Sequence, residues 1–269
     1  SLAPLILFLL LYNLGGFIGL MPVWENENSR MFIITSVYMA ISAIFFAAYV
    51  AEDPVKRFPL FARAYVFAAV IASVIAIAGY FDVGGWGAIL SPISRAQGTF
   101  KDPNVLSTYL IFPATYLLHG ILIGQKRFPL LSASALVIII LAIFLSFSRG
   151  AWMNFMLSAT LVTILTFALT PSPKLRLRVL LLALLGAVAL SLVILYLLSI
   201  PEVAEIFSQR LTLAMGYDAG ERGRFGNQLR SLQYLFETPL GFGPRLFYTY
   251  FGQDPHNVYL NAFASYGWL

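Results

Sequence analysis

The 269-residue sequence contains no cysteine and has few charges. Without cysteine it can form neither a disulfide nor a thiolate metal site. Charged residues make up 11% of the chain and hydrophobic residues 59%, whereas about a quarter of the residues in a soluble domain are charged. So few charges cannot cover a water-facing surface, and lipid must therefore be the outer solvent.

Several motifs that carry chemistry are also absent. No HExxH and no close cluster of His, Asp and Glu predicts a metal site, and neither a Walker motif nor a Gly-x-Ser-x-Gly elbow occurs. The net charge is +5, but no basic run alternates with aromatic residues as a nucleic-acid surface requires. We therefore expect no metal, no cofactor and no nucleic-acid partner.

Long apolar runs predict helices that span a membrane, because a span needs about 20 mostly apolar residues. Seven stretches qualify, at 2–22, 31–51, 60–80, 104–123, 129–147, 151–170 and 179–200. An eighth begins at about 256, and because the sequence starts at Ser1 and stops inside that apolar stretch, we expect a fragment of a longer protein. The prediction is an all-α, polytopic transmembrane helical bundle, with residues 1–269 forming a single domain and an extracytoplasmic loop at about 201–255.

The charges of the loops predict the orientation of these spans. One set carries eight Lys or Arg against two acidic residues, with its cations at Lys56, Arg57, Arg63, Lys126, Arg127, Lys174, Arg176 and Arg178. The other set carries nine cations against ten acids. Short loops rich in Lys and Arg stay in the cytoplasm, so residues 81–103 and 201–255 are expected outside.

Two outer segments place arginines near predicted helix starts. In residues 95–104, Asp102 is a good N-cap and Pro103 suits the first helical position, so a helix start there would favour an anion near Arg95. The same residues could simply cap the helix. Arg149 lies in a tight outer turn between two apolar runs, where an arginine has a functional partner or extends to lipid headgroups as an anchor.

Residues 221–244 predict an amphipathic helix at the membrane surface. Arg224 opens it, and four apolar residues recur at helical spacing on one face, namely Phe225, Leu229, Leu232 and Phe236. Such a helix lies in the interface with its apolar face toward lipid. Because arginine suits bidentate phosphate contacts, Arg222 and Arg224 are candidate ligands of an anion. We interpret three others as a solvated or headgroup-binding face: Arg210, Arg230 and Arg245.

His256 follows an Asp-Pro pair like the one at residues 102–103, so we expect it in the first turn of the eighth span, with Asp254 as the cap. A neutral imidazole there could accept a proton from a hydroxyl. A lone histidine is more often structural, and His119, near the inner end of the fourth span, fits that role. His256 differs because it shares the outer face with several arginines.

Together these segments resemble the O-antigen ligase/polymerase superfamily. The resemblance rests on motifs that occur in order, namely Arg95 with GTFKDPN, SRG at 148–150, GRF at 223–225, PLGFGP at 239–244 and DPHNVYL at 254–260. The superfamily includes ligases that move O-antigen onto lipid A–core in lipopolysaccharide biosynthesis, O-antigen polymerases and protein O-glycosylation ligases. It implies a multi-pass protein of the bacterial inner membrane whose active site faces the periplasm.

The resemblance also implies a chemistry, which is metal-independent, inverting glycosyl transfer from an undecaprenyl-diphosphate glycan donor. The acceptor hydroxyl would belong to lipid A–core, another glycan or a protein, and membrane lipid would surround the enzyme. The catalytic residues would be His256, which acts on the acceptor hydroxyl, with Arg224 and Arg149, which bind the donor diphosphate. Arg222 and Arg95 are further candidates for that diphosphate. Ligase activity is the first expectation, with polymerase and protein ligase as alternatives.

A transporter or flippase of lipid-linked glycans is a rival from a different class. Its charged residues would line a path near the bilayer midplane, whereas the cations here sit at the ends of the spans. That distribution favours an interfacial enzyme. A purely structural scaffold would leave the outer arginines and His256 without a role.

Overall fold

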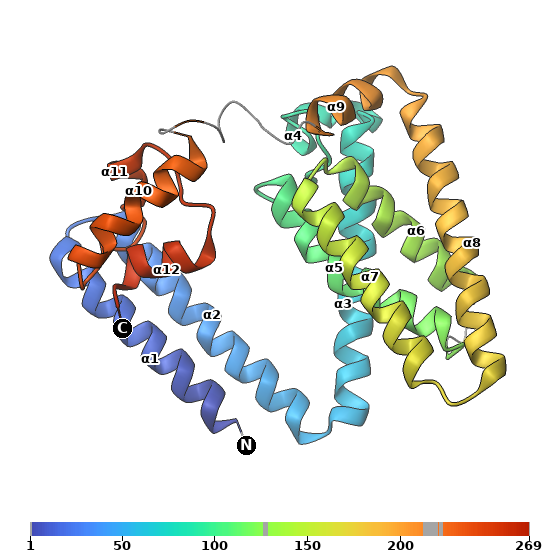
Figure 1. Cartoon of the computed structure of the whole chain (residues 1–269), viewed down its shortest axis with the longest axis horizontal. Helices are drawn as coiled ribbons and strands as arrows, with labels where there is room; N and C mark the ends of the chain where they lie inside the picture. Colours follow the sequence, from blue (N-terminus) through green and yellow to red (C-terminus); the bar gives the residue numbers. More distant parts are fainter. Residues whose placement is uncertain (1, 126–128, 212–219, 221–222, 269) are drawn as a thin grey trace. The chain divides into compact units, whose positions relative to one another are not determined.

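The computed structural model describes residues 2–125, 129–211, 220 and 223–268, and every regular element in these ranges is helical. The α-helices are α1 (Ala3–Leu20), α2 (Glu27–Glu52), α3 (Pro54–Tyr80), α4 (Gly87–Leu90), α5 (Pro103–Leu122), α6 (Pro129–Leu145), α7 (Arg149–Leu169), α8 (Pro173–Leu198), α9 (Pro201–Leu211), α10 (Arg224–Glu237), α11 (Phe247–Phe251) and α12 (Val258–Tyr266). Two 3₁₀ turns, η1 (Met21–Val23) and η2 (Val83–Gly85), follow α1 and α3 (Figure 1). The predicted all-α class is confirmed.

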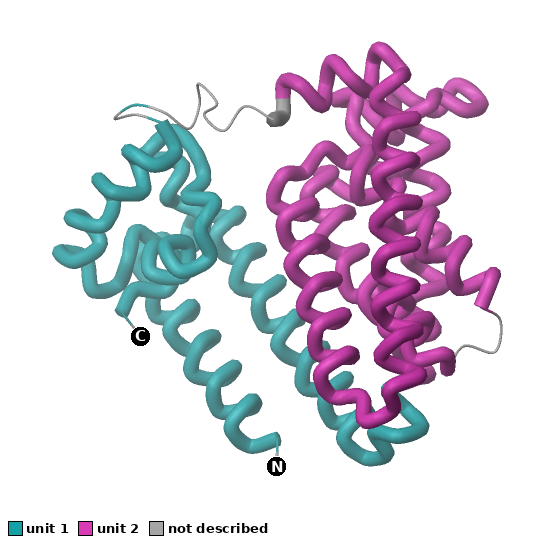
Figure 2. The backbone as a smooth tube through the Cα atoms, turned by 45° about the vertical axis from the view of Figure 1, so that its right-hand side comes forward, with its two compact units in different colours: residues 1–58, 213–269 teal, residues 59–212 magenta. Residues whose placement is uncertain are grey.

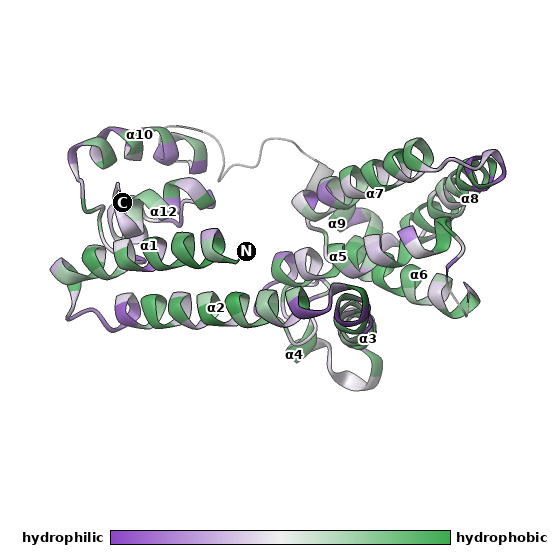
Figure 3. Ribbon diagram, turned by 90° about the horizontal axis from the view of Figure 1, so that it is seen from below, coloured by the Kyte–Doolittle hydropathy of each residue, from purple (hydrophilic) through white to green (hydrophobic). Residues whose placement is uncertain are grey.

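Six of these helices are long and apolar enough to cross a membrane, and the chain is a multi-pass membrane protein. They are α1 with η1, α2, α3, α5, α7 and α8. The seventh predicted stretch is α6, an apolar helix of 17 residues. Figure 3 shows hydrophobic residues around the long helices, whereas α10 alternates hydrophobic and hydrophilic positions.

The described chain forms two compact units, coloured separately in Figure 2. Unit 1 comprises Ser1–Phe58 with Leu213–Leu269, and unit 2 comprises Pro59–Thr212. The boundary falls inside α3, next to Pro59, which is an internal proline of that helix. A proline at this position removes a backbone donor and interrupts the helical ladder.

Helix α5 forms the centre of unit 2, where it packs against α6 and α7. Half of its apolar window is buried, more than for any other described span. The helix starts at Pro103, and the Asp102 side chain accepts a hydrogen bond from Asn104 N at 2.7 Å. The predicted helix start at Asp102–Pro103 is therefore confirmed.

In unit 1, α1 packs against α2 and α12 through small residues. A β-carbon on Gly19 would lie 2.6 Å from Ser265 O, so only glycine permits this approach. Tyr266, at the end of α12, donates from its hydroxyl to Ser36 Oγ at 3.2 Å, and Ser36 in turn donates to Asn13 Oδ1 at 2.9 Å. Small residues and hydrogen-bonding side chains are what hold helices together in lipid.

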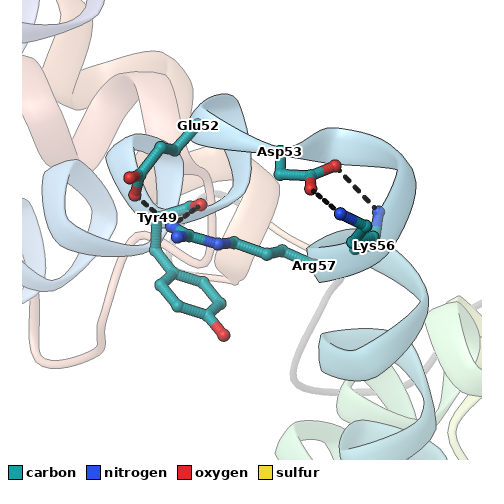
Figure 4. Close-up of polar contacts among 5 residues, drawn as sticks. All are labelled: Tyr49, Glu52, Asp53, Lys56 and Arg57. Atoms are coloured by element: carbon teal, nitrogen blue, oxygen red, sulfur yellow. Dashed lines mark hydrogen bonds and ion pairs between the residues drawn. The ribbon is translucent and has the colours of Figure 1, made fainter.

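Ionic contacts concentrate at the corner between α2 and α3 (Figure 4). Lys56 Nζ lies 3.2 Å from Asp53 Oδ2, and Arg57 pairs with Glu52 and donates to Tyr49 O at 3.0 Å. Exposed pairs of this kind contribute about 0–1 kcal/mol each. This corner belongs to the loops that charge predicts to be cytoplasmic, and its cations are engaged by neighbouring residues.

The segments predicted to lie outside gather at one end of each unit. In unit 1, Ser29 Oγ, at the start of α2, donates to Pro244 O at 2.7 Å, and α10, α11 and α12 lie at this end of α1 and α2 (Figure 1). In unit 2, Arg95 Nε donates to Ser146 O at 2.7 Å and ties the loop after α4 to the end of α6. Each unit therefore has its own polar end, where the candidate residues lie.

Candidate functional site

Helix α10 begins where the sequence predicts, with Gly223 as N-cap and Arg224 as its first residue. The four residues of the predicted apolar face are all exposed: Phe225, Leu229, Leu232 and Phe236. The face turned into unit 1 carries Asn227, Ser231 and Leu235, which are buried. The helix is amphipathic as predicted, and its polar side packs inward.

That inward side holds the loop between α11 and α12. Three polar side chains of α10 donate to carbonyl oxygens in and next to this loop. Asn227 Nδ2 donates to the O of Phe251, the last residue of α11, at 3.1 Å, Gln228 Nε2 to Pro255 O at 2.5 Å and Arg224 to His256 O at 3.1 Å. Hydrogen bonds from a charged donor such as arginine are stronger than neutral ones. Arg224 and His256, which the sequence proposes as partners in one site, are thus brought into direct contact.

The helix start predicted at Asp254–Pro255 is wrong. Helix α12 starts at Val258, and the N-cap is Asn257, whose side chain accepts from Tyr259 N at 3.0 Å and from Leu260 N at 3.1 Å. An asparagine that satisfies two helix N–H groups is a strong cap. His256 consequently precedes the helix, with its backbone in the left-handed region at a φ of 47°, and its position depends on α10.

His256 lines a cavity of about 410 Å³ in unit 1. Phe32 and Phe247 contribute apolar walls, whereas Arg245 and Asp254 contribute charges. His256 is exposed. A pocket with apolar walls and a few converging polar groups is the usual form of a small-molecule site.

Arg149 is the first residue of α7 in unit 2, after a turn of three residues that follows α6. Ser148 is the N-cap and accepts from Ala151 N at 3.4 Å, and the buried Phe147 has a left-handed backbone with a φ of 48°. The predicted tight turn is therefore confirmed. Arg149 stands at a helix N-terminus, where backbone N–H groups favour anions.

Arg95 is buried in unit 2, with 6% of its surface exposed. Its Nε donates to Ser146 O at 2.7 Å, and its Nη2 donates to Asn104 Oδ1 at 3.1 Å. The neighbouring Ala96 N also donates to Leu145 O at 2.9 Å. The geometry makes Arg95 a residue that fixes the turn before Arg149.

A second cavity, of about 900 Å³, lies at the same end of unit 2, between the end of α3, α4 and α9. Arg95 reaches its wall, but Asp82, Glu202 and Glu205 also line it. Three carboxylates repel a further anion, because like charges at short range raise its energy. This cavity is therefore a poor place for a diphosphate.

The predicted residues divide between the units. Arg224 and His256 belong to unit 1, Arg95 and Arg149 belong to unit 2, and Arg222 lies outside the described residues. Arg245, which the sequence assigns to a solvated or headgroup-binding face, lines the His256 cavity. Asn227 and Gln228 were not predicted as site residues, and their spacing from Arg224 on the polar side of α10 was the available signal.

Within the described ranges, no group of three or more His, Asp or Glu side chains is placed to hold a metal ion. Carboxylates lie at both polar ends, and the cations beside them are mainly arginines. These side chains are always protonated and present several donors in a fixed plane, which suits phosphate. The chemistry that the described residues can offer is anion binding together with proton transfer to an imidazole.

Comparison with known proteins gives one family. Neither the curated proteins nor the solved structures provide a match. The family model for O-antigen ligase matches residues 134–269, which is half of the sequence and includes α7, α10, the His256 loop and α12. The motifs from SRG to DPHNVYL lie within this range, and the segment around Arg95 lies before it. On this match, the chain belongs to the O-antigen ligase family.

Proposed function

We propose that this protein transfers a glycan from an undecaprenyl-diphosphate donor to an acceptor hydroxyl at the periplasmic face of the bacterial inner membrane, as an O-antigen ligase. The observation that carries the proposal is the hydrogen bond from Arg224 to the backbone of His256, a residue that lines the 410 Å³ cavity. A base and a cation that recognises phosphate stand together there, in a chain of the O-antigen ligase family.

The proposed reaction needs one proton acceptor and one anion-binding group. The acceptor oxygen attacks the anomeric carbon, and the bond from that carbon to the diphosphate oxygen breaks. The electron pair leaves with the lipid diphosphate, and the hydroxyl proton passes to the His256 imidazole. Arg224 stabilises the charge that grows on the leaving group, and displacement from the opposite side inverts the anomeric centre.

Arg149 is proposed to bind donor diphosphate as well. Its place at the first position of α7 supports this, because the free N–H groups of a helix start and the guanidinium act on an anion in the same direction. The role is proposed from the surroundings of Arg149 in unit 2 and from the family.

We expect His256→Ala to lower the transfer rate about 10²–10⁴-fold, the range typical of a general base. Arg224→Ala should cost at least as much, because it removes a cation and also one of three hydrogen bonds that hold the His256 loop. The measurement is the rate of formation of glycosylated acceptor by the purified intact protein with added lipid-linked donor.

His119→Ala is the matched control, since His119 is exposed in unit 2 and is the other histidine of the chain. It should keep the wild-type rate, and EDTA should not slow the wild type. Full activity of both His256→Ala and Arg224→Ala would contradict the catalytic roles proposed for these residues. Inhibition by EDTA would contradict the metal-independent mechanism. Movement of donor across proteoliposomes without a new glycosidic bond would identify a flippase instead.

A further inference from the structure

The cavity beside His256 contains a cation that the proposed mechanism does not use. Arg245 lines this cavity together with His256 and Asp254. Within the described part of the chain, the Arg245 guanidinium has neither a hydrogen-bond nor an ion-pair partner, and its side chain is exposed. Arg224, in contrast, donates to the His256 carbonyl oxygen. Arg245 is therefore the arginine of this cavity that is available to a ligand.

The backbone at Arg245 adopts a conformation that disfavours an arginine. Its φ is 62°, in the left-handed region, where residues other than glycine are uncommon. The turn is fixed on both sides, because Phe242 N donates to Ala264 O at 2.8 Å and Ser29 Oγ donates to Pro244 O at 2.7 Å. A long charged side chain held at such a position is a feature that clusters at functional sites.

The position of Arg245 indicates which substrate it faces. In the proposed function, His256 accepts a proton from the acceptor hydroxyl, so the groups that share its cavity lie next to the acceptor. An arginine there favours an oxyanion on the acceptor, while Asp254 on the same cavity wall can accept hydrogen bonds from sugar hydroxyls.

We propose that Arg245 is a specificity-determining residue that binds a phosphate group of the acceptor glycan, close to the hydroxyl that is glycosylated. This inference rests on the proposed function. It assigns the His256 cavity to an acidic acceptor and leaves the donor diphosphate to other arginines.

The test compares Arg245→Gln and Arg245→Lys with the wild type, using one acceptor with its phosphate groups and the same acceptor after enzymatic dephosphorylation. Arg245→Gln should raise the KM for the phosphorylated acceptor at least tenfold and change the KM for the dephosphorylated acceptor less than twofold. Arg245→Lys should lie between, because lysine keeps the charge and loses the bidentate geometry. The KM for the lipid-linked donor should not change.

Arg30→Gln is the control for loss of one positive charge in unit 1, since Arg30 donates to Trp24 O at 2.8 Å and does not line the cavity. A raised donor KM in Arg245→Gln would assign Arg245 to the donor diphosphate and overturn the inference. Equal effects on both acceptors, or none on either, would also overturn it. Absence of transfer by the wild type would instead count against the proposed function. Thermal unfolding of each variant identifies any that fail to fold.

Discussion

Arg95, Arg224 and Arg245 have the same side chain, but their surroundings give them different tasks. Arg95 is buried and donates to Ser146 O and Asn104 Oδ1. Arg224 is half-buried and donates to His256 O, whereas Arg245 is exposed at the cavity. Burial with satisfied donors is typical of a positioning residue, and exposure at a cavity is typical of a ligand-binding one.

Arg95→Ala should destabilise the protein by about 1–3 kcal/mol, because Ser146 O loses its charged donor inside unit 2. Arg95→Lys should recover only part of this, since one ammonium group cannot reach both partners in the same way. Thermal unfolding of the purified protein measures the loss. Arg63→Ala, at an exposed position of α3, should change stability by less than about 0.5 kcal/mol. If Arg95→Ala kept wild-type stability and raised the KM for the donor, Arg95 would be a donor-binding residue and not a positioning one.

The sequence predicts the residues whose positions are fixed by neighbours in the chain. It does not predict those fixed by residues far away in the sequence. Capping is local, so Asp102 as N-cap and Arg224 as a helix start were both predicted. The position of His256 was not, because the Asn257 cap competes with the Asp-Pro pair and α10 fixes the loop from 32 residues away. The turn that carries Arg245 is fixed by hydrogen bonds to α2 and α12, and no local sequence pattern reveals these bonds.

At the scale of the element, α10 combines two functions on two faces. Its polar side holds the His256 loop, and its exposed apolar face carries the stripe Phe225, Leu229, Leu232 and Phe236. An exposed apolar stripe on a helix that follows membrane spans favours insertion into the lipid interface. Lipid would then fix the height of the His256 loop relative to the bilayer surface.

The absence of cysteine allows a direct test of this orientation. Leu229, with 71% of its surface exposed, should react slowly as Leu229→Cys with a water-soluble maleimide in liposomes, because lipid covers it. Glu237→Cys, at an exposed acidic position at the end of α10 and outside the apolar stripe, should react rapidly. A nitroxide on the lipid chains should broaden the signal of a spin label at position 229 and not that of a label at position 237. Equal reactivity at both positions would place α10 in water.

At the scale of the whole molecule, composition predicts more than local pattern does. The six long apolar helices and the helical class follow directly from the lack of charge. The division into two units within α3 was not predicted, because it depends on which helices contact one another and not on hydropathy. The short helices α4 and α11 were also missed, since they have four and five residues, too few for a periodic signal.

The orientation of the molecule decides whether the proposed donor can reach the candidate residues, because the polar ends of the units must face the compartment where lipid-linked glycans are used. Loop charge predicts that this compartment is the periplasm. Val83→Cys, in the loop after α3, should therefore react with an impermeant maleimide in spheroplasts, whereas Lys56→Cys, at the corner between α2 and α3, should react only after lysis. Both side chains are exposed, so access to the reagent and not burial determines the result. The opposite pattern would turn the His256 cavity toward the cytoplasm and contradict the proposed periplasmic transfer, while the contact between Arg224 and the His256 loop would stand unchanged.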